Sequence, residues 1–216
     1  MRHNGAMRSG QGLFIVFEGG EGTGKSTQAR LLAQSLKRAG RKVVLTSEPG
    51  GTARGARIRS ILLTKHKEPL DPMTEFFLFE ADRAEHVARV IAPALQRGTD
   101  VICDRFSGST FAYQGYGQGL IRLHEKEMEH IDALARRNIK PDLCILLDMD
   151  PARAIARIKG AKNSLEKEAL TFHKRVRSGF LAQARKRPGR WIVINAQHPI
   201  EEIHKKIWRQ VEPLMK

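Results

Sequence analysis

Residues 19–26 spell Gly-Gly-Glu-Gly-Thr-Gly-Lys-Ser, and this segment constrains the fold more than any other part of the chain. It matches the pattern G-x-x-x-x-G-K-[ST], which functions between a strand and a helix. The apolar, β-prone run Leu13–Phe17 comes before it, and helically spaced apolar residues follow between Thr27 and Arg38. The glycines let successive backbone N–H groups turn toward one anion at the start of the helix. The segment therefore predicts a binding site for the phosphates of a nucleoside triphosphate.

The predicted phosphate loop supplies a set of consecutive ATP-binding residues. They are Gly19, Gly20, Glu21, Gly22, Thr23, Gly24, Lys25, Ser26 and Thr27. Lys25 is expected to reach the β- and γ-phosphates, and the Ser26 hydroxyl is expected to join the coordination of Mg²⁺. An ordinary glycine-rich turn would not require this Lys-Ser pair. The loop indicates a triphosphate ligand without specifying the reaction.

Apolar, β-branched runs recur along the chain with helical patterns between them. The strand candidates are Leu13–Phe17, Val43–Thr46, Asp100–Cys103, Leu143–Asp148 and Trp191–Asn195. This alternation predicts an α/β fold with a five-stranded parallel sheet flanked by helices on both faces. The carboxyl ends of the strands then share one edge of the sheet, where ligands collect.

Three longer helices are expected between and after these strands. One covers Pro72–Arg97, with Pro93 marking a bend or a break, and the others cover His124–Asn138 and Ile200–Met215. A length of 216 residues suits one domain. We expect residues 13–216 to form it, after a disordered tail over residues 1–12.

The composition narrows the setting in which the chain works. Cys103 and Cys144 lie in apolar runs, which favours core packing over a disulfide or a metal cluster. No apolar run approaches the length of a membrane span. We expect a reduced, cytoplasmic setting, with an organellar transit peptide or a start at Met7 as alternatives for the N-terminal region.

The formal net charge of +15 suggests nucleic acid as a possible partner. However, the Lys and Arg pairs are dispersed along helices, and aromatic residues that could stack on bases are absent around them. We therefore expect no dedicated nucleic-acid site. A polynucleotide-binding ATPase remains the alternative from another functional class.

Charged residues at predicted strand ends and on one helix refine the reaction. Asp104 ends an apolar strand, as expected of a carboxylate that holds Mg²⁺ together with Ser26. Arg105 follows it and could bind a phosphorylated acceptor in a bidentate manner. Phe79 and Arg83 lie one helical turn apart, which suits a nucleobase that is stacked and hydrogen-bonded.

Several segments together resemble the thymidylate kinases over nearly the whole chain. They are Phe17-Glu18-Gly19 through Thr27, Glu48-Pro49-Gly50-Gly51-Thr52, Phe79-Glu80-Ala81-Asp82-Arg83, Asp104-Arg105-Phe106-Ser107-Gly108-Ser109 and Ala112-Tyr113-Gln114-Gly115. The resemblance implies a nucleoside-monophosphate kinase fold and transfer of the ATP γ-phosphoryl group to dTMP, giving dTDP and ADP. A methyl group leaves no mark in a sequence, so a kinase for another pyrimidine nucleotide remains an alternative.

The resemblance also implies a set of dTMP-binding residues. Arg105 and Arg59 would hold the phosphate, Phe79 would stack on thymine, and Arg83 would donate to a base carbonyl. Thr110 and Gln114 would contact the base edge, Ser109 would line the same pocket, and Glu21 and Glu48 would lie near the sugar and the metal.

A lid at about residues 151–170 is the last feature that the resemblance implies. Relatives whose phosphate loop lacks Arg place catalytic cations in this lid, and the candidates here are Arg157 first and Lys159 second, beside Lys25 and Arg105. The chain departs from the family pattern at Asn163-Ser164, where an Asp-Arg pair is usual, and also at Ser47 and Asn195. Family members usually form homodimers through helices, for which the apolar face of residues 72–97 is available.

Overall fold

The protein is represented by a computed structural model that describes residues 11–64, 68–157 and 166–215. Five strands form one parallel sheet in the order β2-β3-β1-β4-β5. The strands are β1 (Phe14–Glu18), β2 (Val43–Ser47), β3 (Asp100–Asp104), β4 (Leu143–Asp148) and β5 (Trp191–Asn195). This confirms the predicted five-stranded parallel sheet, with bounds within one residue of those expected.

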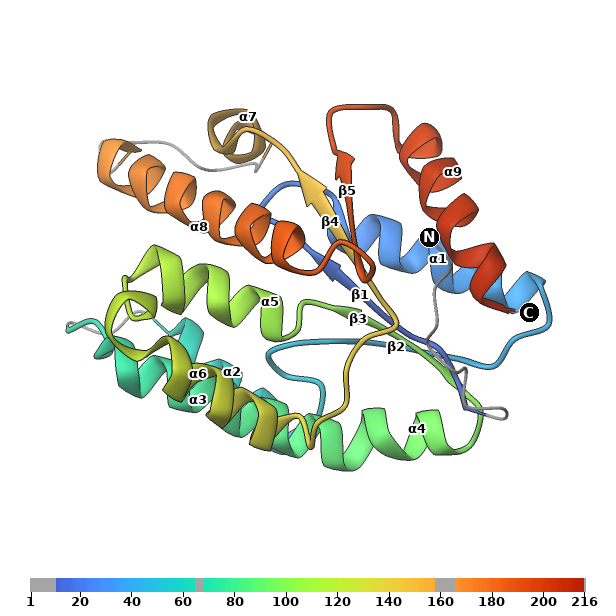
Figure 1. Cartoon of the computed structure of the whole chain (residues 1–216), viewed down its shortest axis with the longest axis horizontal. Coiled ribbons are helices and arrows are strands. Elements are labelled where there is room, and N and C mark those ends of the chain that lie inside the picture. The colour runs from blue at the N-terminus through green and yellow to red at the C-terminus, as the bar shows by residue number, and fades with distance from the viewer. Residues whose placement is uncertain (1–10, 65–67, 158–165, 216) are drawn as a thin grey trace.

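Helices cover both faces of the sheet (Figure 1). The α-helices are α1 (Lys25–Arg38), α2 (Ala53–Leu63), α3 (Pro72–His86), α4 (Ala92–Gln96), α5 (Ser107–Thr110), α6 (Ile121–Ala135), α7 (Pro151–Ala156), α8 (Glu166–Lys186) and α9 (Ile200–Val211). Two π-helical segments, η1 (Val87–Ile91) and η2 (Phe111–Gly117), and the 3₁₀-helix η3 (Glu212–Met215) extend them. None of the helices in the described ranges combines the length and apolar character needed to cross a lipid bilayer.

The alternation of side chains along β1 divides the core into two layers. Ile15 and Phe17 pack in a cluster with residues of α1 and α9. Phe14 and Val16 point to the other face, where they pack with residues of η1, η2 and α8. Because β1 is central and buried on both faces, its first four residues are all apolar and do not alternate with polar residues.

The helix expected over residues 72–97 differs from the prediction at Pro93. The chain stays helical through α3, η1 and α4, and Pro93 lies in the first turn of α4 directly after the π-helical turn. A proline ring crowds the preceding turn of an α-helix and lacks an N–H donor. The wider π turn accommodates both effects, so the helix changes its winding and continues.

The other long helices also differ at their ends. The helix expected over residues 124–138 spans Ile121–Ala135 and has non-helical angles at His124. It ends before Arg137 and Asn138, which both have positive φ angles. The last helix becomes 3₁₀-helical at Glu212, next to Pro213.

Two further predictions from the sequence concern the N-terminal tail over residues 1–12 and the two cysteines. Residues 1–10 lie outside the described residues, whereas Gly12 donates from its backbone to Leu95 over 3.1 Å and is buried. Cys103 and Cys144 are buried free thiols, as predicted.

Candidate active site

The phosphate loop connects the end of β1 to the start of α1. Gly19 has a φ of 140°, and a Cβ atom there would lie 2.5 Å from the Leu147 carbonyl oxygen, so the loop can lean on β4 only if this residue is glycine. Gly24 precedes α1 in a left-handed conformation and offers no side-chain cap. The first N–H groups of α1 are therefore left for an anion.

Lys25 is held inside this loop. Its ammonium group donates to the Gly20 carbonyl over 2.7 Å, and the residue is 6% exposed. Burial, and then the nearby positive charge of Arg105, lower the pKa of Lys25 to about 8. The lysine is thus a desolvated cation, and a bound polyphosphate would supply the negative charge that stabilises it.

Ser26 and Asp104 meet where α1 begins and β3 ends. The Ser26 hydroxyl donates to Oδ2 of Asp104. The other oxygen, Oδ1, is buried and has no hydrogen-bond partner in the part of the chain that the structure describes. An unsatisfied carboxylate oxygen beside a hydroxyl suits Mg²⁺, which takes few protein ligands and is completed by phosphate oxygens and water. The described residues contain no cluster of three or more acidic, His or Cys side chains that could hold a metal alone.

A cavity of about 600 Å³ lies beside the phosphate loop; we call it the acceptor cavity. All nine residues predicted to bind dTMP line it, together with Lys25, Ser26 and Asp104. The nine are Glu21, Glu48, Arg59, Phe79, Arg83, Arg105, Ser109, Thr110 and Gln114. They come from the phosphate loop, the β2–α2 connection, α2, α3, the end of β3, α5 and η2. Residues far apart in the sequence therefore converge on one site at the carboxyl edge of the sheet.

Arg105 lies between the phosphate loop and this cavity. Its guanidinium donates to Glu21 over 2.6 Å, to the Gly19 carbonyl over 3.1 Å and to Ser109 over 3.1 Å. It also lies 5.1 Å from the centre of the Tyr113 ring. Its backbone φ of 73° is unusual for a residue with a side chain. A strained residue held by several contacts at a cavity wall is typical of a functional position.

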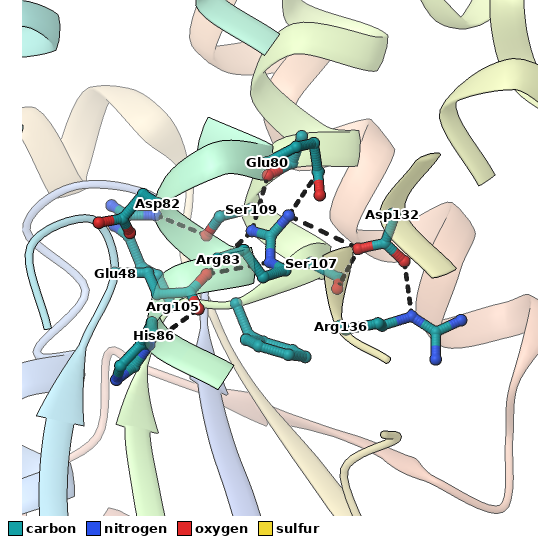
Figure 2. A network of polar contacts seen from close by, with 12 residues as sticks. Glu48, Glu80, Asp82, Arg83, His86, Arg105, Ser107, Ser109, Asp132 and Arg136 are labelled. Carbon is teal, nitrogen blue, oxygen red and sulfur yellow. Dashed lines mark hydrogen bonds and ion pairs between the residues drawn. The ribbon is translucent and has the colours of Figure 1, made fainter. Parts of the chain in front are cut away.

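Arg83 is the centre of a buried network of charges (Figure 2). It donates to Glu48 over 3.0 Å, to Thr110 over 2.9 Å and to Glu80. Its guanidinium also lies over the ring of Phe106, 5.1 Å from the centre. Burial raises the pKa of Glu80 to about 7, although the charge of Arg83 opposes the rise. The network fixes Arg83 in place at the wall of the acceptor cavity.

The remaining predicted residues are also held by the protein. Arg59 donates to the Pro49 carbonyl over 2.7 Å, and Gln114 donates to Glu75 over 2.8 Å. Phe79 is half-buried at the cavity wall, whereas the neighbouring Phe76 is fully buried in the core. Phe76 therefore belongs to the core and, unlike Phe79, does not line the acceptor cavity.

Arg157 lies apart from these groups. It does not line the acceptor cavity but a second one of about 430 Å³, the loop-side cavity, with Thr23, Gly24 and Thr27 of the phosphate loop. Its guanidinium donates to the Ala196 carbonyl over 3.1 Å. The structure therefore does not bring Arg157 together with Lys25 and Arg105. Lys159, and residues 158–165 of the expected lid, lie outside the described residues.

Sequence reasoning missed several side chains that support the site. Glu18 and Tyr113 lie in the segments that carry the family resemblance, but no role was predicted for them. Glu18 accepts from Ser109 over 2.6 Å and from the backbone of Phe106 over 3.1 Å. Tyr113 accepts from Arg105 over 3.2 Å. Asp132 is on α6, and no local signal in the sequence connects it to Arg83, which lies 3.5 Å away.

Comparison with known proteins agrees with this geometry. The family model described as thymidylate kinase matches residues 17–207. A thymidylate kinase from Synechococcus sp. (strain JA-2-3B'a(2-13)) is 47% identical over 93% of this chain and 95% of its own length. One from Deinococcus radiodurans is 44% identical over 93% of this chain and 97% of its own length.

A solved structure extends the comparison to the fold. The crystal structure of thymidylate kinase from Ehrlichia chaffeensis superposes with a TM-score of 0.78 at 33% identity, covering 93% of this chain and 99% of the other. With a phosphate loop, a candidate metal pair and a convergent acceptor cavity in place, these matches lead to one conclusion: the chain belongs to the thymidylate kinase family.

Proposed function

We propose that the chain transfers the γ-phosphoryl group of ATP to dTMP, giving dTDP and ADP, with dTMP bound in the acceptor cavity. The observation that carries this proposal is the convergence of the nine acceptor residues with Lys25, Ser26 and Asp104 around one space of about 600 Å³. A cavity of this size lies within the range of small-molecule sites. Donor and acceptor phosphates would meet beside Lys25.

ATP binds with its phosphates in the phosphate loop. The N–H groups of the loop and of the first turn of α1 donate to the phosphate oxygens, and Lys25 neutralises their charge. The loop-side cavity then receives the nucleoside part, next to Thr23, Thr27 and Arg157. In this arrangement Arg157 contacts the donor nucleotide and is not the cation that stabilises the transferring group.

Ser26 and Asp104 hold the Mg²⁺ that accompanies ATP. When bound, the ion supplies positive charge to the β- and γ-phosphate oxygens. Asp104 contributes the buried oxygen that has no other partner among the described residues.

Arg105 and Arg59 bind the phosphate of dTMP, and the base lies against Phe79. Arg105 is poised between the phosphate loop and the acceptor cavity, so it aligns the acceptor oxygen with the γ-phosphate. Tyr113 and Ser109 accept hydrogen bonds from its guanidinium group and so fix the orientation of that group. The attacking oxygen is already ionised at neutral pH, so the reaction requires no strong general base.

The setting and assembly are part of the proposal. We propose a cytoplasmic enzyme, in line with its buried free thiols. We also propose a homodimer through α2, α3 and α6, because large apolar side chains are exposed on them: Leu63 on α2, Phe77 on α3, and Leu123 and Leu134 on α6. Light scattering coupled to size-exclusion chromatography would test this, and a monomer at micromolar concentration would contradict it.

An ADP-release assay tests the proposed reaction directly. Mg-ATP is supplied with dTMP, dUMP, dCMP, dGMP or single-stranded DNA as the added component. We expect rapid turnover with dTMP and only slow release without an acceptor. Turnover with dUMP instead would assign another pyrimidine nucleotide, and turnover stimulated only by DNA would favour the polynucleotide-dependent ATPase.

A further inference from the structure

A third cavity, of about 480 Å³, is lined by the start of α5, the end of α6 and the connections that lead into β4 and β5, and we call it the basal cavity. It lies where the α6–β4 and α8–β5 connections reach the amino ends of β4 and β5. It also reaches the end of β1 at Glu18, and the side chain of Phe106 lines both this cavity and the acceptor cavity. None of the roles described so far uses this space.

The inner surface of the basal cavity is apolar and aromatic. Trp191, Phe106 and Cys144 line it, and they are 7%, 1% and 7% exposed. The Trp191 ring lies close to Gly108, where an added Cβ atom would be 2.8 Å from the ring. A flat apolar group could therefore pack against an ordered aromatic surface.

The opening of the basal cavity is positively charged. Arg136, Lys140, Arg187 and Arg190 line it. Lys140 and Arg187 are exposed and form no ion pair with a carboxylate in the described ranges. The Arg190 guanidinium donates to the Pro141 carbonyl over 3.4 Å, and its charge also acts on Asp142. The two acidic residues of the lining, Asp132 and Glu18, are buried and bonded to other groups. Three cations are thus available to one anion.

A chain of contacts connects the basal cavity to the acceptor cavity. Arg136 lines the basal cavity and donates from Nε to Oδ2 of Asp132 over 2.7 Å. Oδ1 of the same carboxylate accepts from Ser107 and lies 3.5 Å from Nη1 of Arg83, which lines the acceptor cavity. Figure 2 shows Asp132 between the two arginines. An anion that attracts Arg136 would leave Asp132 free to pull on Arg83.

We propose that the basal cavity binds a small anion made of a phosphate group and a flat apolar body, and that its occupancy weakens acceptor binding through Arg136, Asp132 and Arg83. The apolar inner surface of the cavity would contact the apolar body, and Lys140, Arg187 and Arg190 at the opening would bind the phosphate group. The binding site stands on its own geometry. The effect on the acceptor rests on the proposed dTMP site.

Calorimetric titration with 1-naphthyl phosphate tests the binding site. The protein is first saturated with dTMP and Mg-ADP, so that the nucleotide sites are filled. We expect binding that weakens about tenfold or more in the double variant Lys140→Ala/Arg187→Ala, which removes two exposed cations of the opening. The matched control Lys205→Ala/Arg209→Ala, on exposed positions of α9, should bind as the wild type does.

Two simpler probes separate the two parts of the ligand. Inorganic phosphate lacks the apolar body and 1-naphthol lacks the charge, so each should bind more weakly than 1-naphthyl phosphate. Equal affinity of the wild type and both double variants, or no binding at all, overturns the site. Equal affinity for inorganic phosphate overturns the apolar part of the assignment.

Kinetics test the connection to the acceptor cavity. We expect 1-naphthyl phosphate to raise the KM for dTMP several-fold in the wild type, with the KM for ATP unchanged and no effect in Lys140→Ala/Arg187→Ala. Binding without a change in the KM for dTMP overturns the coupling. Because calorimetry does not depend on turnover, failure of the proposed dTMP site and failure of the basal cavity are distinguishable.

Discussion

At the scale of single residues, Lys25 is a buried cation whose charge changes near neutral pH. Burial and Arg105 lower its pKa to about 8, so the free protein loses this charge above that pH. ATP binding requires the protonated form, and we expect the Kd for Mg-ATP to rise about tenfold for each pH unit above 8. Isothermal titration between pH 7 and pH 9 measures this slope. Lys25→Arg should abolish the slope, since arginine stays charged throughout, and an unchanged slope in that variant would contradict the assignment.

Arg105 combines a strained backbone with a guanidinium at the junction of the two substrates. Arg105→Ala should lower kcat/KM for dTMP by a factor of roughly 100 to 1,000, as expected when a charge-assisted contact to a phosphate is lost. The KM for ATP should change little. Arg105→Gly separates the two features, because glycine adopts the φ of 73° without strain. Both variants should lose the same activity, whereas wild-type dTMP kinetics in either one would refute the acceptor role.

At the scale of elements, Glu18 attaches the end of β1 to α5. It accepts from Ser109 and from the backbone of Phe106, and burial raises its pKa to about 7. The folded state therefore holds this proton more tightly than the unfolded chain, whose glutamates titrate near 4.5. The sign follows from linkage: between pH 4.5 and pH 7 the unfolding free energy contributed by Glu18 falls as pH rises, by up to about 3 kcal/mol.

Urea unfolding at pH 5 and at pH 7.5 tests this contribution. Glu18→Gln stays neutral at both values, so its unfolding free energy should depend less on pH than that of the wild type. Equal pH dependence of the two proteins would mean that Glu18 is ionised in the folded state at pH 5.

The elements also show what the sequence could predict. Every strand was located to within about one residue, because apolar runs bounded by turns are a strong local signal. The π-helical turns η1 and η2 were not predicted, since a widened turn depends on what it packs against and on crowding near Pro93. The helix expected to end at residue 138 ends at residue 135, because Arg137 and Asn138 have positive φ angles that are incompatible with a helix, and the apolar spacing did not show this.

At the scale of the whole molecule, most residues of the candidate site were predicted from the resemblance to a family and fewer from the chemistry of the residues themselves. The phosphate loop, Arg105 and the pairing of Phe79 with Arg83 were predicted from the residues alone, whereas the other acceptor residues came from segments shared with a family. The ion pairs of Arg83 with Glu48, Glu80 and Asp132 join three regions of the chain, which no local pattern could connect. The position of Arg157 in the loop-side cavity could not be predicted either, because its guanidinium is held by the carbonyl of Ala196, which directly follows β5.

The separation of the loop-side and acceptor cavities predicts additive stabilisation by the two ligands. Mg-ADP and dTMP, each at 100 times its Kd, should each raise the unfolding free energy by about 2.7 kcal/mol, and together by the sum. Thermal unfolding monitored by calorimetry checks this. Lys25→Ala should lose most of the increment from Mg-ADP and keep that from dTMP, whereas the loss of both would place the two ligands in one site.

The contacts of Arg83, Gln114 and Arg59 have a consequence for inhibitor design. Each of these side chains is already held by another part of the protein before any ligand arrives. A ligand therefore does not have to immobilise them, and little rotamer entropy is lost when it binds. Rigid compounds should therefore bind this pocket with little loss of conformational entropy on either side, whereas flexible compounds would lose the entropy of their own rotatable bonds.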